Sequence, residues 1–389
     1  MKTILHISAD FPDSIVPVKT KAVERLIAGA DGYRHIVYSL NRVNWRSDIA
    51  MLAFGEDRIA VAYGAPPYGL RLRSYLTPLA EAIGADLRRR GITPDLIHAH
   101  KFAVEGIIAD ELSAATGAPF IASLWGDSDG KFFEGKPNLR AYYRDLARRA
   151  VLLLPAAPWT GRYFASALGL EESRIEVLPI MTAADAILPP RLCGKPHVVT
   201  TFHWDSWPRK GFDTLLQAVA LLAANREEVR LDVYGRGGPK SLLEMTRLIE
   251  RFELGERVTL QRGLDMSQVQ QVMNGYAAFA MPSRRETYGM VYIEAVLAGV
   301  PILYPQNQGV DGIFEGMSIG YACDTQSAAD VADGLRLLLI QEPRLKDEIA
   351  RLQQNGALDH VRSTAISARY STLLATLTAA PYQAAVSAA

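Results

Sequence analysis

The sequence has few cysteines, no excess of charge of one sign and no long hydrophobic run. Its 389 residues include only Cys193 and Cys323, which are far apart and have no second Cys or His at ligand spacing. This pattern favours a reducing compartment and argues against structural zinc. Lys plus Arg equals Asp plus Glu, at 42 each, so the basic excess of a nucleic-acid-binding protein is missing.

No stretch approaches the roughly 18 apolar residues of a membrane-spanning helix. The N-terminal segment MKTILHISADF has too short an apolar run for a signal peptide. We therefore expect a cytoplasmic protein, with room for peripheral contact at the inner face of a membrane.

Short apolar runs alternate with helical patterns in two series, separated by the proline-rich residues 183–196. This alternation predicts parallel sheets with helices on both faces, and therefore two Rossmann-like domains. The expected strands are 2–9, 34–40, 58–62, 95–98, 119–124, 150–154 and 174–179 in the first series, and 197–202, 230–234, 258–261, 277–281, 300–304 and 320–323 in the second.

Residues 276–304 predict a strand, a loop, a helix and a second strand. The apolar run 277–281 stops at a Pro-Ser pair, and a helical pattern extends from about residue 288 to Gly299. The backbone N–H groups at the start of this helix have no earlier turn to bond, so they predict an anion site, above all for phosphate. The residues that present them are Thr287, Tyr288, Gly289 and Met290.

Two carboxylates flank this predicted phosphate site. Glu286 comes just before the helix and Glu294 a little over two turns later. A carboxylate beside a phosphate repels the ligand unless it accepts hydrogen bonds from hydroxyls, so the pair suggests a nucleotide sugar. The alternative is that Glu286 caps the helix and Glu294 is a solvated helix position.

The Glu286 to Glu294 spacing, set between MPS and EAVLAGVPIL, resembles the E-x7-E signature of retaining GT-B glycosyltransferases of family 4. The resemblance implies that Glu286 lies against the donor sugar, that Glu294 binds the ribose hydroxyls and that the residues between them hold the diphosphate. It also implies two Rossmann-like domains facing each other across a cleft, with a C-terminal helix crossing back to the first. The expected limits are 1–185 for the acceptor domain, 186–196 for the linker, 197–365 for the donor domain and 366–389 for the helix and tail.

The segment TFHWDSWPRKGFDTLLQAV resembles the family's basic pair before a glycine. Arg209 and Lys210 would then neutralise the diphosphate and the charge that grows as the glycosidic bond breaks. The arginine that the family usually carries upstream is replaced by Trp204, which therefore occupies a donor-site position. Gly235 resembles the family's glycine turn facing the cleft, and Gly263 falls where the nucleotide base usually meets the backbone, although glycine turns are common in such folds.

The acceptor side departs further from the family. Its usual Gly-Gly pair is absent, and Lys19 is the basic residue offered instead. His100 ends a strand in the sequence HAH, where it either binds a ligand or is a packed side chain. Trp125 stands where many members have a histidine, and it could stack on a sugar.

Asp127 is a candidate catalytic-site residue in the segment DSD. This D-x-D pattern binds a divalent metal in the other major glycosyltransferase fold. The surrounding alternation and the E-x7-E loop belong to GT-B, so we expect no metal and no cofactor, and a contact with acceptor hydroxyls.

These patterns predict a retaining transferase that moves a sugar from a nucleoside diphosphate sugar to a saccharide or lipid-linked hydroxyl acceptor, in cell-surface polysaccharide or glycolipid assembly. Two alternatives remain: a GT-B phosphorylase or epimerase, and a non-catalytic nucleotide-sugar-binding subunit.

Overall fold

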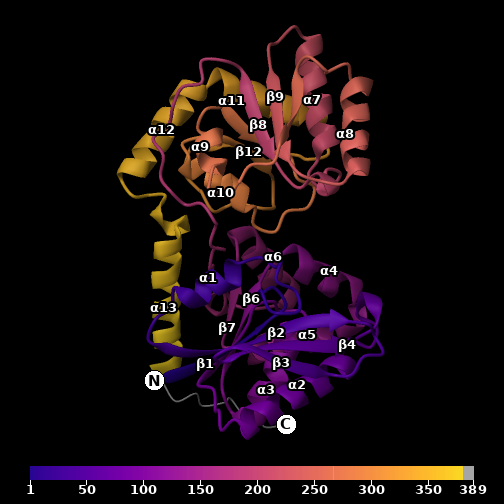
Figure 1. Cartoon of the computed structure of the whole chain (residues 1–389). Helices are drawn as coiled ribbons and strands as arrows, with labels where there is room; N and C mark the ends of the chain where they lie inside the picture. Colours follow the sequence, from indigo (N-terminus) through magenta and orange to yellow (C-terminus); the bar gives the residue numbers. More distant parts are fainter. Residues whose placement is uncertain (266, 380–389) are drawn as a thin grey trace. The chain divides into compact units, whose positions relative to one another are not determined.

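The computed structural model describes residues 1–265 and 267–379, without the side chains of residues 127 and 128. The chain divides into two compact units. Unit 1 contains Met1–Met181 together with the segment that begins at Ser363, and unit 2 contains Thr182–Arg362. Each unit has a sheet of its own (Figure 1).

Unit 1 contains a seven-stranded sheet with the order β3-β4-β2-β1-β5-β6-β7. All neighbouring strands are parallel except β3, which pairs antiparallel with β4 at the edge. The strands are β1 Lys2–Ser8, β2 Tyr33–Val43, β3 Ala50–Gly55, β4 Arg58–Gly64, β5 Leu96–Ala99, β6 Phe120–Leu124 and β7 Leu152–Pro155. The strand predicted at 174–179 is wrong, because that segment forms only an isolated bridge between Ile175 and Leu153.

Seven α-helices belong to the described part of unit 1. They are α1 Ala22–Ala28, α2 Leu72–Arg89, α3 Glu105–Thr116, α4 Asp127–Gly135, α5 Arg140–Arg149, α6 Pro158–Leu168 and α13 Ser363–Ala379. Helices α4 and α6 were not predicted from the sequence. Helix α6 has common start and stop signals, because Pro158 is at its first position and Gly169 is its C-cap residue in the left-handed conformation.

Helix α13 returns the end of the chain to unit 1 (Figure 1). Its buried residues Ile366, Tyr370 and Leu374 share a hydrophobic cluster with Ile4 and Leu96 of the sheet. The expected return of a C-terminal helix to the first domain is therefore confirmed. Residues 380–389 of the predicted tail lie outside the described residues.

A hydrogen bond fixes α13 to the middle of the sheet. The hydroxyl of Tyr370 lies 2.8 Å from Nδ1 of His98, and both residues are fully buried. We expect Tyr370→Phe to lower the free energy of unfolding of unit 1 by about 1 kcal/mol, because it leaves a buried ring nitrogen without this partner. Denaturant unfolding would measure the change. The control is Thr372→Ala, at an exposed position of the same helix. It should change stability less than Tyr370→Phe does.

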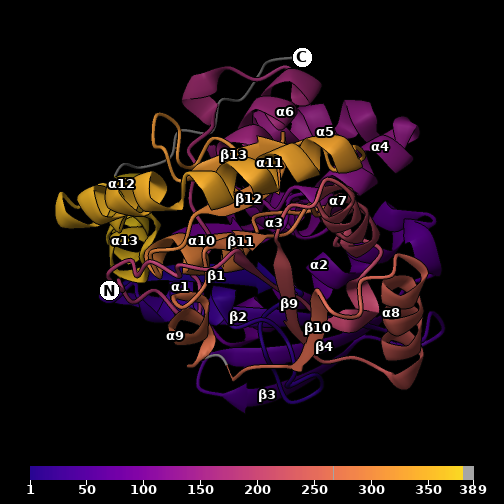
Figure 2. The ribbon, with the colours of Figure 1, turned by 90° about the horizontal axis from the view of Figure 1, so that it is seen from above.

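Unit 2 contains a six-stranded parallel sheet with the order β10-β9-β8-β11-β12-β13. The strands are β8 His197–Thr201, β9 Arg230–Gly235, β10 Val258–Arg262, β11 Ala278–Ala280, β12 Ile302–Pro305 and β13 Gly320–Cys323. The helices are α7 Phe212–Ala224, α8 Pro239–Arg251, α9 Val269–Met273, α10 Met290–Leu297, α11 Ala328–Ile340 and α12 Glu342–Gln354. Figure 2 shows α11 lying beside β12 and β13. Met266, in the helix predicted at 266–274, lies outside the described residues.

The strand order of unit 2 determines where its ligand site should lie. Numbered within the unit, the order is 3-2-1-4-5-6, and the direction of winding reverses between β8 and β11. Loops that leave these adjacent strands diverge at their carboxyl ends and form a binding position. No helix in the described part of the chain is both long and apolar enough to cross a membrane.

Candidate functional site

An ion pair joins the two loops at the reversal point of the unit 2 sheet. Nζ of Lys210, in the loop after β8, lies 2.6 Å from Oε2 of Glu286, in the loop after β11. The side chains are only 15% and 12% exposed, respectively. A charge-assisted hydrogen bond in this partly desolvated setting is stronger than a surface ion pair. The structure thus brings together two predicted site residues that are 76 positions apart.

A second set of bonds fixes the same two loops. The backbone N–H of Arg284 donates to the carbonyl of Arg209 at 2.9 Å. The guanidinium of Arg284 donates to Asp213 at 2.7 Å and to the carbonyl of Pro208 at 3.0 Å. Arg284 is therefore a positioning residue that the sequence analysis missed. The side chain of Arg209 belongs to an exposed residue, and its predicted phosphate contact stays a prediction.

The predicted anion site lies at the start of α10. Gly289 is the N-cap residue, with a φ of 77°, and α10 begins at Met290, two residues later than expected. A side chain at position 289 would place its Cβ 2.4 Å from Cδ2 of Tyr292. Within the described chain, no hydrogen bond is made by the backbone N–H groups of residues 287–291. These groups are available to an anion.

The structure argues against the alternative in which Glu286 caps the helix and Glu294 is a solvated position. Glu286 does not cap α10, because no side chain caps that helix and Oε2 of Glu286 accepts from Lys210 instead. Glu294 is only 7% exposed, so it is not a solvated helix position. The contacts predicted for these two residues, with the donor sugar and with the ribose, stay predictions.

The loop after β12 also contacts Glu286, a contact that was not predicted from the sequence. Oε1 of Gln308 accepts from the backbone N–H of Glu286 at 3.0 Å. The N–H of Gly309 donates to the carbonyl of Glu286 at 3.4 Å. The peptide groups on both sides of Glu286 are therefore held. An amide side chain in a polar loop gives no sequence signal for such a role.

The remaining donor-site candidates lie around the ends of β9 and β10. Trp204 packs against Gly235, where an added Cβ would lie 2.3 Å from the indole Nε1. This Nε1 is buried and has no hydrogen-bond partner among the described residues. An added Cβ at Gly263 would lie 2.6 Å from Cγ of Arg236. The ring of Tyr288 is 1% exposed, so only its backbone is available to a ligand.

Gly211 allows the loop after β8 to lie close to the loop after β11, because it has no side chain. Its φ is 68°, and an added Cβ would lie 1.9 Å from the carbonyl oxygen of Pro282. We expect Gly211→Ala to destabilise unit 2 by more than about 1 kcal/mol, because both the conformation and the space favour glycine. Thermal unfolding would show a lower Tm. The control is Gly255→Ala, since a Cβ there meets nothing within 4 Å; equal shifts in the two variants would contradict the prediction.

The predicted acceptor-side residues lie at the carboxyl edge of the unit 1 sheet. Nζ of Lys19 donates to Asp13 at 2.9 Å and to the hydroxyl of Ser39 at 3.0 Å. Lys19 is thus engaged within the protein, and its phosphate contact stays a prediction. Trp125 is half-buried, and Nζ of Lys101 lies 5.6 Å from its ring centroid. The side chain of Asp127 lies outside the described residues.

A buried acid that the sequence analysis missed stands at the same edge. Glu105 is fully buried and accepts from the backbone N–H of Ala9 at 2.7 Å through Oε1. Its Oε2 has no hydrogen-bond partner within the described chain. Lys101 pairs with Asp10 at 2.6 Å nearby. Burial raises the pKa of Glu105 to about 8, although the charge of Lys101 opposes this.

The raised pKa of Glu105 predicts a pH dependence of stability. The folded chain keeps a proton that the unfolded chain releases above the ordinary pKa of 4.5. Raising the pH from about 5 toward about 8 therefore favours unfolding through this group. We expect the free energy of unfolding to fall less steeply over this range in Glu105→Gln, which keeps the bond to Ala9. Urea unfolding at several pH values would measure both slopes, and parallel slopes would contradict the assignment.

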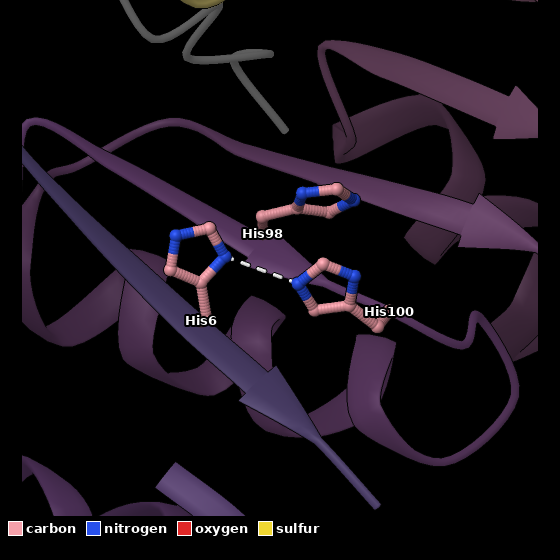
Figure 3. Close-up of side chains that lie close together, drawn as sticks. All are labelled: His6, His98 and His100. Atoms are coloured by element: carbon pink, nitrogen blue, oxygen red, sulfur yellow. Dashed lines mark hydrogen bonds between the residues drawn. The ribbon is translucent and has the colours of Figure 1, made fainter. Parts of the chain in front are cut away.

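Three histidines lie close together in unit 1 (Figure 3). His6 comes from β1, and His98 and His100 come from the end of β5 and the residue after it. All three are buried, and one ligand atom from each lies within 4.8 Å of the others. This spacing is compatible with a metal ion, although the expectation from the sequence was that the protein needs none.

Comparison with known proteins connects both units to one enzyme family. Residues 206–357 match the family model "Glycosyl transferases group 1", and residues 23–181 match "Glycosyl transferase 4-like domain". The chain belongs to glycosyltransferase family 4. Its two parallel-sheet units have the GT-B fold.

Two curated relatives of this family 4 chain share about a quarter of their aligned residues with it. A GDP-mannose-dependent alpha-(1-6)-phosphatidylinositol monomannoside mannosyltransferase of Mycobacterium tuberculosis is 27% identical over 256 residues, or 61% of this chain and 65% of the relative. A D-inositol 3-phosphate glycosyltransferase of Pseudarthrobacter chlorophenolicus is 25% identical over 275 residues, or 66% of this chain and 65% of the relative. The chain thus spans 65% of the length of each.

Two solved structures resemble the family 4 chain over almost its whole length. Sucrose-phosphate synthase from Thermosynechococcus elongatus has a TM-score of 0.72 and 18% identity, covering 97% of this chain and 100% of that one. HepE of Anabaena, solved with UDP, has a TM-score of 0.68 and 17% identity, covering 97% and 100%. At these identities the likeness concerns the fold.

Proposed function

We propose that the chain is a retaining glycosyltransferase that transfers a sugar from a nucleoside diphosphate sugar to a hydroxyl acceptor. The observation that carries this proposal is the Lys210–Glu286 pair at the reversal point of the unit 2 sheet. It lies beside the start of α10, where backbone N–H groups are available to an anion. A cation, an acid and free amides in one place match a ligand that combines phosphates with hydroxyls.

In the proposed reaction, the bond between the anomeric carbon and the diphosphate oxygen breaks. The acceptor oxygen attacks the same face, and its proton passes to the leaving diphosphate. Lys210 and Arg209 would stabilise the charge that develops on the leaving group. Glu286 would accept hydrogen bonds from the donor sugar, Glu294 would hold the ribose, and the amides from Thr287 to Met290 would bind the phosphates. Same-face attack and these contacts come from the family resemblance.

The names of relatives suggest donors and acceptors to test. One relative is named as dependent on GDP-mannose, and another as using UDP-N-acetylglucosamine. HepE has been solved with UDP-glucose. Two relatives are named for phosphatidylinositol and inositol phosphate acceptors. We propose a role in glycolipid or surface polysaccharide assembly, with a cytoplasmic location and peripheral membrane contact as the corresponding expectation.

The test is a binding screen of GDP-mannose, UDP-glucose and UDP-N-acetylglucosamine, followed by assays for release of free nucleoside diphosphate and for the anomeric configuration of the product. A retained configuration would support the proposal, and an inverted one would contradict the retaining step. Binding without turnover across many acceptors would favour a non-catalytic subunit. Turnover of a sugar phosphate without nucleotide would favour a phosphorylase. Turnover that persists in EDTA would support the expected independence from metal.

A further inference from the structure

Hydrogen bonds between their rings join His35, His6 and His100 of unit 1 in series. Nε2 of His35 lies 2.7 Å from the carbonyl oxygen of Ala30. Nδ1 of His35 lies 2.9 Å from Nε2 of His6. Nδ1 of His6 lies 3.0 Å from Nε2 of His100, as the dashed line in Figure 3 shows. The series therefore ends at Nδ1 of His100.

Burial favours the neutral form of all three rings. Burial lowers the pKa of His6 and of His100 well below the ordinary value, and it also lowers the pKa of His35. A neutral imidazole has one N–H donor and one bare acceptor nitrogen. Fixing the proton on one ring of the series therefore fixes the proton on the next.

The carbonyl of Ala30 sets the direction of the series. A carbonyl can only accept, so Nε2 of His35 carries the proton and Nδ1 of His35 is bare. His6 must then donate from Nε2, which leaves its Nδ1 bare. His100 must in turn donate from Nε2. It follows that Nδ1 of His100 is an acceptor without a proton.

This bare nitrogen belongs to a residue that lines a small cavity. Nδ1 of His100 has no hydrogen-bond partner among the residues that the structure describes, and it lies on the side of the ring turned away from His6 (Figure 3). The cavity has a volume of about 20 Å³, and His100, Ser123, Trp125 and Leu178 are among its lining residues. That is room for about one water molecule or one hydroxyl group. A bare imidazole nitrogen can accept one hydrogen bond, so an O–H group in this cavity is a suitable donor.

We propose that this cavity binds one hydroxyl group of a sugar or polyol, which donates its hydrogen bond to Nδ1 of His100. His35 and His6 are positioning residues that keep His100 in the accepting tautomer. Trp125 and Leu178 supply apolar surface for the C–H groups that surround such a hydroxyl. The inference deepens the acceptor side of the proposed function and rests on it for the identity of the ligand.

A metal ion bound by His6, His98 and His100 would require several hydrogen bonds of these rings to break. The bond between His6 and His100 uses the nitrogens that face each other. His98 bonds Tyr370 through Nδ1 at 2.8 Å and Ser123 through Nε2 at 2.9 Å. In the hydrogen-bonded arrangement every ring nitrogen of His35, His6 and His98 has a partner without an ion, and only Nδ1 of His100 does not. Metal binding is therefore an outcome that the experiment can detect.

The experiment is NMR of the full chain labelled with ¹⁵N-histidine, because the long-range correlations of each ring distinguish its two tautomers. We expect His100 to carry its proton on Nε2. Added myo-inositol should shift the Nδ1 resonance if the hydroxyl belongs to an acceptor, whereas added UDP-glucose should shift it if the hydroxyl belongs to the donor sugar. Either shift supports the hydroxyl site and identifies its source.

Two variants test the positioning role. His35→Gln can accept from His6 and donate to Ala30, so it should keep the His100 tautomer. His35→Leu removes the fixed acceptor, so a second set of His100 signals with Nδ1 protonated should appear and the affinity for the effective probe should fall several-fold. Identical His100 tautomers in His35→Leu and the native chain would overturn this role.

Other results would overturn the hydroxyl site itself. A proton on Nδ1 of His100 in the native chain would do so, as would an Nδ1 resonance that neither probe moves. Stoichiometric Zn²⁺ that removes the ring N–H signals of His6 and His100 would assign the cluster to a metal instead. None of these readouts requires turnover, so the proposed transferase activity can fail while the tautomer assignment stands, and the reverse also holds.

Discussion

Lys210→Ala should lower kcat by about 100- to 1,000-fold, the size of effect seen when one group that stabilises a developing negative charge is removed. The ammonium lies at the reversal point of the unit 2 sheet and is 2.6 Å from Glu286. In the proposed reaction it balances charge that grows on the departing diphosphate, so its loss should cost more in the transition state than in the bound donor. Steady-state kinetics with the donor found in the binding screen would measure kcat and KM.

The loss of Lys210 also leaves Glu286, which is 12% exposed, without its cation. Part of any effect could then come from a shifted carboxylate or reduced stability. Lys240→Ala is a matched control, because that lysine is 89% exposed on α8 of the same unit. A double-mutant cycle with Glu286→Gln would separate the coupling between the two side chains from their individual effects. If Lys210→Ala kept more than a tenth of native kcat with an unchanged Tm, Lys210 would not stabilise the leaving group.

The fold was predictable from the sequence where strands are buried on both faces. The strands predicted in the second series were all found, because each contains a short apolar run with buried residues in one parallel sheet. Edge strand β3 was missed although residues 50–54 form a short apolar run. It pairs only with β4, and all of its residues are exposed or half-buried, so it differs from the buried parallel strands that the prediction was based on. The run at 174–179 was taken for a strand because its apolar residues do pack inward, Leu178 among them, but they do so without a ladder of backbone bonds.

The site was predictable only where a motif is local in sequence. The segment around Glu286 and the pair before Gly211 each have a recognisable local pattern. The distance between Lys210 and Glu286 follows from the adjacency of β8 and β11, which no local pattern contains. Gln308 reaches Glu286 from a third loop, for which the sequence gives no signal.

The histidine series shows the same limit more strongly. Its members come from three separate strands or strand ends, and they meet because β1 pairs with both β2 and β5. In the register of the sheet, His6 lies opposite His98. Each histidine alone is an ordinary residue of a strand, and only the sheet order turns His35, His6 and His100 into a directed series.

Glu286→Gln should lower kcat by about 100-fold and leave nucleotide binding nearly intact. The proposed role of Glu286 is to hold the donor sugar in the reactive orientation, whereas Glu294 and the amides at the start of α10 would hold the nucleotide. Glutamine keeps the size of the side chain and one acceptor oxygen, and the backbone bonds to Gln308 and Gly309 are unaffected. The charge that pairs with Lys210 is lost, so the sugar should become less well oriented without a change in the loop.

Calorimetric titration with UDP and GDP would give the nucleotide affinity, and single-turnover measurements would give the rate of transfer. Glu250→Gln, at an exposed position of α8, is the matched control and should change neither quantity. A fall in nucleotide affinity equal to the fall in kcat would place Glu286 in nucleotide binding instead of sugar orientation. Native turnover in Glu286→Gln would remove this carboxylate from the mechanism. The remaining support for a donor site in unit 2 would then be the free amides at the start of α10 and Lys210, which specify a phosphate but no sugar.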